Sequence, residues 1–252
     1  MLLNIEQLIN LTITFNTSVI IEENKIFDNC EFRFFIDNEA KVDENYLSTR
    51  KDWFDFLKWN DCRQIYVGFF NSSESFETVG FANGGFPWII VAEYKNKFEY
   101  WCPFWTLKKD EKTKTLWVIN FKPLKINSVF KPVYLINTSI EDQKQKLYNV
   151  LEETSRFANQ HKYTKQFITT FKNAIERLEG NDQIDFIPTN IPYRSFEKKN
   201  RQLLAAATKA FVFGGSGSWN DVGLETQGDY QYITTSLYDT INNSIVVSIN
   251  NK

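Results

Sequence analysis

The residues in this chain that are best suited to chemistry lie close together, between Gly214 and Asp221. The segment reads Gly-Gly-Ser-Gly-Ser-Trp-Asn-Asp. Glycine adopts backbone conformations that other residues avoid, and serine, asparagine and aspartate side chains hydrogen-bond to nearby backbone groups or to a ligand. The segment therefore indicates a loop of special shape, which serves either as a binding site or as a tight connection.

Two common functional loops do not match this segment. A phosphate-binding loop follows a strand and opens a helix, whereas this segment follows a predicted alanine-rich helix at 195–207 and lacks the dinucleotide and Lys-Ser/Thr signatures. A nucleophile elbow reads Gly-x-Ser-x-Gly, but Ser218 stands where the second glycine belongs after Ser216. We first interpret the segment as a helix C-cap and connection, with a packed tryptophan and side chains bonded to local backbone. The alternative is a small-molecule or partner site made of Gly214, Gly215, Gly217, Ser218, Trp219, Asn220 and Asp221.

Other catalytic arrangements have weaker support in the sequence. His161 is the single histidine, in a polar turn between two predicted helices, so a Ser-His-Asp triad would have to use a connector residue. Carboxylate pairs such as Asp37/Glu39 and Asp52/Asp55 are of the type used in acid–base catalysis, but such pairs are mostly solvated surface. We therefore predict no catalytic residue, no metal site and no cofactor.

Composition excludes several classes of protein. Aromatic residues make up 16% of the 252 residues and hydrophobic residues 42%, so the chain has ample apolar surface to fold. The net charge is −2 and no basic stripe is present, so we expect no nucleic-acid partner. Because no uninterrupted apolar run approaches the ~20 residues that span a bilayer, we expect no membrane insertion.

The cysteines and the N-terminus indicate the compartment. Cys30, Cys62 and Cys102 are far apart and odd in number, which favours buried free thiols in a reducing cytoplasm. The first residues have no basic segment typical of a signal peptide. Together with the richness in Asn, Lys, Ile and Phe, these features favour a cytoplasmic bacterial protein.

Two halves of the chain differ in pattern, and they predict an α+β fold. Residues 1–136 are expected to form an antiparallel, aromatic-rich sheet, and residues 137–252 a helical bundle packed on it. Short β-branched and aromatic runs predict strands at 30–36, 64–70, 87–94, 98–102 and 115–121. Spacing at 44–59 is helical instead.

The helical half carries clear start and stop signals. Ser139 and Asp142 resemble a capping box, Thr164 is suited to cap a second helix, and Gly180 suits a left-handed helix end. In the last helix, at 229–250, apolar residues recur every fourth position. This period outweighs the strand propensity of the β-branched run near its end.

Aromatic residues on both sides of the expected turn at 95–97 are candidates for an interface. Trp88, Tyr100, Trp101 and Trp105 are of the types that anchor protein–protein contacts, and the alternative is that they are core residues alone. Stacking on single-stranded nucleic acid is not expected, because lysine and arginine do not accompany these residues.

The C-terminal part resembles a set of uncharacterised bacterial proteins. The resemblance covers roughly residues 200–250 and lies in an alanine-rich helix, the segment Val212-Phe-Gly-Gly-Ser-Gly-Ser-Trp-Asn-Asp221 and an amphipathic last helix. It implies no activity. Small soluble proteins of this kind often resemble immunity or accessory proteins of bacterial toxin systems.

These observations lead to one main hypothesis and two others. We expect a non-catalytic protein-binding module, immunity-like in its most specific form, that covers the surface of a protein partner. The alternative is a small-ligand-binding protein or enzyme that uses the Gly214–Asp221 loop. The third hypothesis is a structural subunit of a homo-oligomer.

Overall fold

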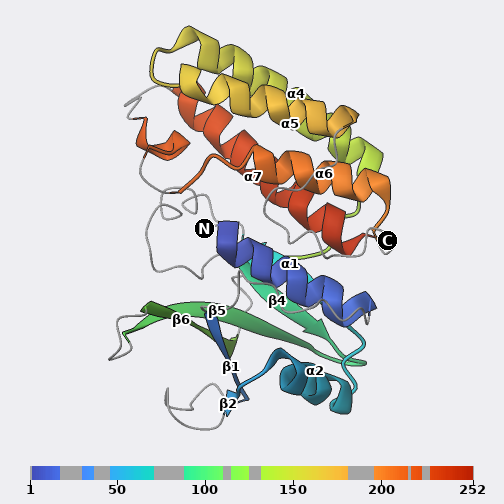
Figure 1. The fold of residues 1–252 in the computed structure, drawn as a ribbon. Helices are drawn as coiled ribbons and strands as arrows, with labels where there is room; N and C mark the ends of the chain where they lie inside the picture. Colours follow the sequence, from blue (N-terminus) through green and yellow to red (C-terminus); the bar gives the residue numbers. More distant parts are fainter. Residues whose placement is uncertain are drawn as a thin grey trace. The chain divides into compact units, whose positions relative to one another are not determined.

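The computed structural model describes residues 2–17, 30–36, 46–70, 88–109, 115–124, 132–180, 196–214, 217–222 and 228–251. The described residues divide into two compact units, one with the described residues between Asn4 and Tyr134 and one with those from Leu135 to Asn251, together with Leu2 and Leu3. The first, called the sheet unit, contains the strands, and the described residues of the second, the helical unit, form only helices and connections (Figure 1). The α+β class and the order of its two parts are as predicted.

The sheet unit has a seven-stranded sheet with strand order β2-β1-β6-β5-β4-β3-β7. The strands are β1 (Cys30–Phe35), β2 (Tyr46–Leu47), β3 (Gln64–Phe70), β4 (Trp88–Glu93), β5 (Phe98–Lys109), β6 (Thr115–Leu124) and β7 (Pro132–Val133). From β3 to β6 each strand pairs antiparallel with the next, which is the predicted meander. The β4–β5 connection falls at Lys95–Lys97, where the sequence predicts a break.

The prediction of a purely antiparallel sheet is wrong at one pair. Strand β1 lies parallel to β6, with Cys30 opposite Trp117 and Phe34 opposite Phe121. Local pattern shows that a segment is a buried strand, but it carries no information on the direction of a neighbour that is distant in sequence. No short hairpin links β1 to β6, so turn residues could not reveal this pairing.

Two helices complete the sheet unit, α1 (Leu2–Thr17) and α2 (Arg50–Trp59). Helix α2 starts later than predicted, because Thr49 is its N-cap and accepts a hydrogen bond from the Asp52 backbone N–H. Helix α1 was not predicted. Its Asn16 side chain donates to the Ile65 carbonyl at 2.7 Å and accepts from the Ile65 N–H at 3.0 Å, so it occupies the edge of β3 as a strand neighbour would.

Aromatic side chains form the core between α2 and one face of the sheet. Trp53 of α2 stacks on Phe34 at 4.6 Å between ring centroids and meets the ring of Trp101 edge-on at 5.4 Å. Phe34 in turn stacks on Phe121 at 4.9 Å. All four side chains are at most 1% exposed, so this face of the sheet is closed by packed rings.

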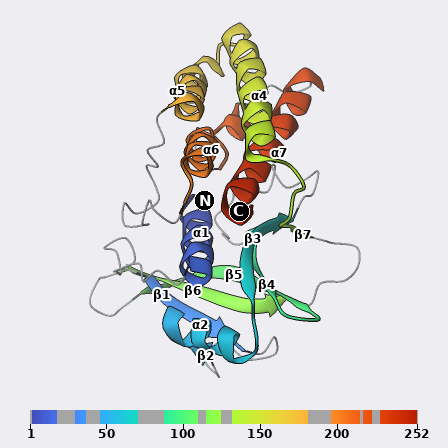
Figure 2. The same cartoon turned by 90° about the vertical axis from the view of Figure 1, so that its right-hand side faces the viewer.

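The helical unit is a bundle of four main helices. They are α4 (Ile140–Gln160), α5 (Ile168–Glu179), α6 (Lys198–Lys209) and α7 (Gly228–Asn250), with short 3₁₀ turns η2 (Lys165–Phe167) and η4 (Trp219–Asp221). Helix α4 packs on α5, α5 on α6, α6 on α7, and α7 on α4, as Figure 2 shows from the side. Buried leucine, isoleucine and alanine side chains from all four helices fill the centre.

Two of the helix signals in this unit are confirmed, and two are not. Ser139 caps α4 and accepts from the Asp142 N–H at 3.0 Å, and α7 covers the predicted segment as a helix. Thr164 precedes η2 but makes no capping bond; its hydroxyl donates to the Ala158 and His161 carbonyls. Gly180 ends α5 with φ −160°, which is extended rather than left-handed, so the predicted glycine geometry is wrong there.

Candidate functional site

The Gly214–Asp221 loop comes after helix α6, as the sequence predicts, and its last three residues form η4. Gly214 has φ +81° and Gly217 has φ +78°, so both glycines use the left-handed region that other residues avoid. Gly215 lies outside the described residues. The predicted role of glycine in shaping the turn is thus visible at two of its three positions.

The polar side chains of the loop bond to one another and to the loop backbone. Asp221 accepts from the Ser218 N–H at 3.1 Å and forms a capping box with it at the start of η4. The Asn220 side-chain oxygen accepts from the Gly214 N–H at 3.2 Å and from the Ser218 hydroxyl at 2.7 Å. Each of these three side chains therefore stabilises the shape of the loop itself.

Trp219 is the packed anchor that the sequence predicts. Its side chain is 0% exposed, and its Nε1–H donates to the Thr234 hydroxyl at 2.8 Å. Phe167 and Phe171 meet its ring edge-on at 5.4 and 5.6 Å, and Tyr230 stacks on it at 5.9 Å and donates to its carbonyl oxygen. Burial raises the pKa of Tyr230, which keeps this phenol a donor. The loop geometry matches a structural joint between α6 and α7.

The remaining predicted chemistry is not assembled in the described part of the chain. The His161 ring lies 4.4 Å from the ring of Phe157 at the end of α4. Asp55 pairs with the exposed Lys51, whose hydrogen bond lowers the pKa of that carboxyl, while Asp52 belongs to the α2 cap. Asp37 and Glu39 lie outside the described residues.

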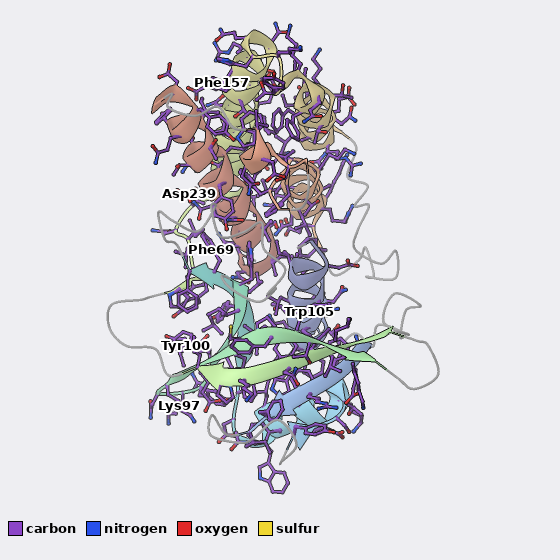
Figure 3. All side chains as sticks on the ribbon, turned by 90° about the vertical axis from the view of Figure 1, so that its left-hand side faces the viewer. Phe69, Lys97, Tyr100, Trp105, Phe157 and Asp239 are labelled. Carbon is purple, nitrogen blue, oxygen red and sulfur yellow. The ribbon has the colours of Figure 1, made fainter. Side chains whose placement is uncertain are left out.

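The four aromatic interface candidates differ in how deeply their side chains are buried. Trp88 and Trp101 are 2% and 1% exposed, so the structure places them in the core and corrects their assignment to an interface. The reason is register: Trp101 is on the sheet face that packs against α2, where it meets Trp53. Tyr100 and Trp105 are half-buried, and Figure 3 shows Tyr100 near the Lys97 end of the sheet unit.

Around Tyr100 the structure reveals a group of residues that the sequence did not. We call it the tyrosine cluster and define it as Tyr66, Glu93, Phe98, Tyr100 and Tyr134. Glu93 lies opposite Phe98, and Tyr66 lies opposite Val91, which is two residues before Glu93. The side chains of Tyr66, Glu93 and Phe98 therefore share one sheet face. The turn at Lys95–Asn96 could have located part of this cluster, because a two-residue turn there pairs Tyr94 with Lys97 and Glu93 with Phe98.

The tyrosine cluster combines packed and exposed surface. Its inner part rests on the buried residues Ile89, Val91 and Cys102, whereas Phe98 is 42% exposed. The Tyr134 ring lies 5.6 Å from the Tyr66 ring and 5.7 Å from the Phe98 ring. The Tyr66 hydroxyl donates to Glu93 Oε2 at 2.5 Å. Burial, the hydrogen bond and the Glu93 charge all raise the pKa of Tyr66, so the phenol remains protonated.

Cysteine side chains and possible metal ligands are further candidate sites in the described part of the chain. Cys62 and Cys102 are buried and free, and burial raises the pKa of each thiol to about 12. Such thiols are poor nucleophiles. Within the described ranges no three His, Cys, Asp or Glu side chains gather as metal ligands would, and no helix is long and apolar enough to cross a membrane.

Comparisons with protein-family models, with curated proteins and with solved structures found no match to this chain. The resemblance over residues 200–250 therefore stays a prediction. Function has to be argued from the geometry of the two units.

Proposed function

We propose that this chain is a non-catalytic protein-binding module that contacts its partner through the tyrosine cluster. The observation that supports the proposal is the exposure of Phe98 beside two half-exposed tyrosines on a rigid sheet. Aromatic side chains on a preformed surface lose little conformational freedom on binding and are typical hot spots of interfaces. The immunity-like role in a bacterial toxin system remains the specific form of this proposal.

The contact surface is suited to a partner because its shape is set by the unit itself. Tyr66 is 8% exposed and is fixed by its hydrogen bond to Glu93. Tyr134 lies between Tyr66 and Phe98 in one row of rings. Scattered exposed apolar residues need no explanation, whereas a contiguous group of partly exposed rings is typical of interaction sites and supports the proposal.

The experiment is a binding assay against the products of the adjacent genes, each purified separately. The double variant Phe98→Ser, Tyr100→Ala should weaken a complex by more than about tenfold, as hot-spot losses do. Tyr232→Ala is the matched control, because this tyrosine is 65% exposed on the helical unit. A complex that withstands the double variant would remove the tyrosine cluster from the interface.

The immunity form of the proposal needs a further result. The adjacent product should be toxic when expressed alone, and co-expression of this chain should restore growth. A neighbour without toxicity and without binding contradicts that form. A concentration-dependent mass of the isolated chain in solution would instead support the homo-oligomer hypothesis.

A further inference from the structure

Two tyrosine–glutamate pairs lie beside each other on the β3–β5 part of the sheet. In the first, the Tyr66 hydroxyl donates to Glu93 Oε2 at 2.5 Å. In the second, the Tyr94 hydroxyl donates to Glu99 Oε2 at 2.7 Å. Glu99 lies opposite Ala92, the residue before Glu93, so the two carboxylates are on opposite faces of the sheet.

The second pair already holds a cation from the chain. Lys97 Nζ lies 2.6 Å from Glu99 Oε1 and 4.7 Å from the centre of the Tyr94 ring. The ammonium group is therefore bound by a carboxylate and by an aromatic face at the same time. This arrangement is a cation–π site supplied in cis.

The first pair has the same two groups and more aromatic surface. The rings of Tyr134 and Phe98 extend it outward from Tyr66, with successive centroids 5.6 and 5.7 Å apart. Among the residues that the structure describes, no lysine or arginine nitrogen pairs with Glu93. Glu93 is partly exposed, and its side chain is on the same sheet face as the exposed ring of Phe98, which lies opposite it.

We infer that the tyrosine cluster binds an arginine side chain of the partner protein, with Glu93 as its counter-ion and the exposed Phe98 ring as its stacking surface. This inference rests on the proposed function and adds the chemistry of recognition to it. Arginine fits better than lysine, since a planar guanidinium stacks on rings and still directs N–H groups in its plane to a carboxylate. Tyr66 occupies one lone pair of Glu93 Oε2, which fixes the carboxylate and leaves Oε1 for the guanidinium.

The first test uses a small probe, the peptide acetyl-Gly-Arg-Gly-amide. It should bind the wild-type chain saturably in about the millimolar range, with chemical-shift changes in the amides of β3, β4 and β5. The same peptide with citrulline, which is neutral and nearly the same shape, should bind at least about tenfold more weakly, and added salt should weaken the arginine peptide. Absence of saturable shifts, or equal binding of the citrulline peptide, overturns the inference without requiring any variant to fold.

The second test compares two matched substitutions in this chain by their effect on the affinity for the partner and for the arginine peptide. Glu93→Gln should reduce affinity about tenfold or more, because it removes one negative charge and keeps the shape. Glu99→Gln makes the same change at the pair that Lys97 already occupies and should leave affinity unchanged. Equal effects of the two variants would contradict the assignment to Glu93.

The two proposals fail in different ways. If Phe98→Ser weakens the partner complex and Glu93→Gln does not, the surface is correct and the arginine is wrong. If neither variant weakens the complex, the partner binds elsewhere and the proposed function loses its surface. If the partner used a lysine instead, Glu93→Gln would still weaken the complex. Replacing each arginine of the partner's contact segment with lysine would then leave the affinity unchanged, and this result also overturns the inference.

Discussion

Replacing Thr234 with valine should destabilise the helical unit far more than its small chemical change suggests. Thr234 is 0% exposed, and its hydroxyl accepts from Trp219 Nε1 at 2.8 Å. Valine keeps the branched shape and nearly the volume of threonine, so the packing around Trp219 should persist. The change leaves the indole N–H without a partner in a site that water does not reach.

The expected loss follows from the cost of an unpaired buried donor. Such a group loses its hydration and gains nothing in return, which costs about 1–3 kcal/mol. Thr234 also hydrogen-bonds to Tyr230, so the loss should lie near the middle of that range rather than at its lower end. With an ordinary dependence on denaturant, a loss of about 2 kcal/mol lowers the urea midpoint by about 1 M.

The assay has to report on the helical unit alone, because two compact units need not unfold together. Trp219 is the only tryptophan after residue 134, so its fluorine signal in protein labelled with 5-fluorotryptophan follows this unit through urea unfolding. Thr235→Val is the matched control, since Thr235 is the half-exposed neighbour on the same helix.

A double-mutant cycle separates the hydrogen bond from packing. In a Trp219→Phe background both the N–H and the fluorine probe are absent, so hydrogen exchange of the α6 and α7 amides follows the unfolding of the helical unit in all four proteins of the cycle. Thr234→Val should then cost at least about 1 kcal/mol less in that background than in the wild type. Equal costs in the two backgrounds, or a cost for Thr234→Val no larger than that for Thr235→Val, would refute the reasoning.

Three other predictions concern single positions. Asn16→Ala should cost about 1–3 kcal/mol in urea unfolding and speed hydrogen exchange at the Ile65 amide, because both bonds to the β3 edge are lost, and unchanged exchange would contradict that role. Gly217→Ala should cost about 1 kcal/mol from its φ of +78° alone, whereas Gly180→Ala should be neutral or stabilising, since nothing lies within 4 Å of either added Cβ. Burial raises the pKa of Glu6 to about 7, above its ordinary value of 4.5, so the folded state retains a proton that the unfolded state releases. Stability should therefore fall by at most about 3 kcal/mol as the pH rises from 4.5 to 7, and Glu6→Gln should abolish that fall in unfolding curves measured across this range.

Local sequence pattern predicts the elements whose stability is decided locally. The predicted strand at 64–70 coincides with β3, because β-branched and aromatic residues there are bounded by turn residues. Helix α7 was recognised although its end is β-branched, since five buried apolar residues recur every fourth position: Ile233, Leu237, Ile241, Ile245 and Ile249. Helix α1 escaped prediction because Glu6, Gln7 and Asn10 are buried together with its apolar residues. A helix buried on several sides has no polar stripe to reveal its period.

The Tyr66–Glu93 contact of the tyrosine cluster could not be predicted for a different reason. Tyr66 and Glu93 are 27 residues apart, and their contact depends on how β3 pairs with β4. A shift of one residue in that pairing would move Tyr66 to the other face of the sheet and separate the two groups. Sequence pattern assigns each residue to a strand, but the register between the strands comes from packing over the whole unit.

The aromatic group around Trp219 and the tyrosine cluster differ in which polar groups and ring surfaces their hydrogen bonds leave available to a partner. At Trp219 the indole N–H is directed to Thr234 and the ring is enclosed by Phe167 and Phe171, so the centre contributes stability and has no surface for a partner. At the tyrosine cluster one hydrogen bond holds the Glu93 carboxylate in place while the row of rings ends in the exposed side chain of Phe98. A fixed carboxylate beside exposed rings costs little to organise when a cation arrives. For this reason the search for function should move from the glycine loop to the tyrosine cluster, where Glu93→Gln and Glu99→Gln distinguish recognition from folding.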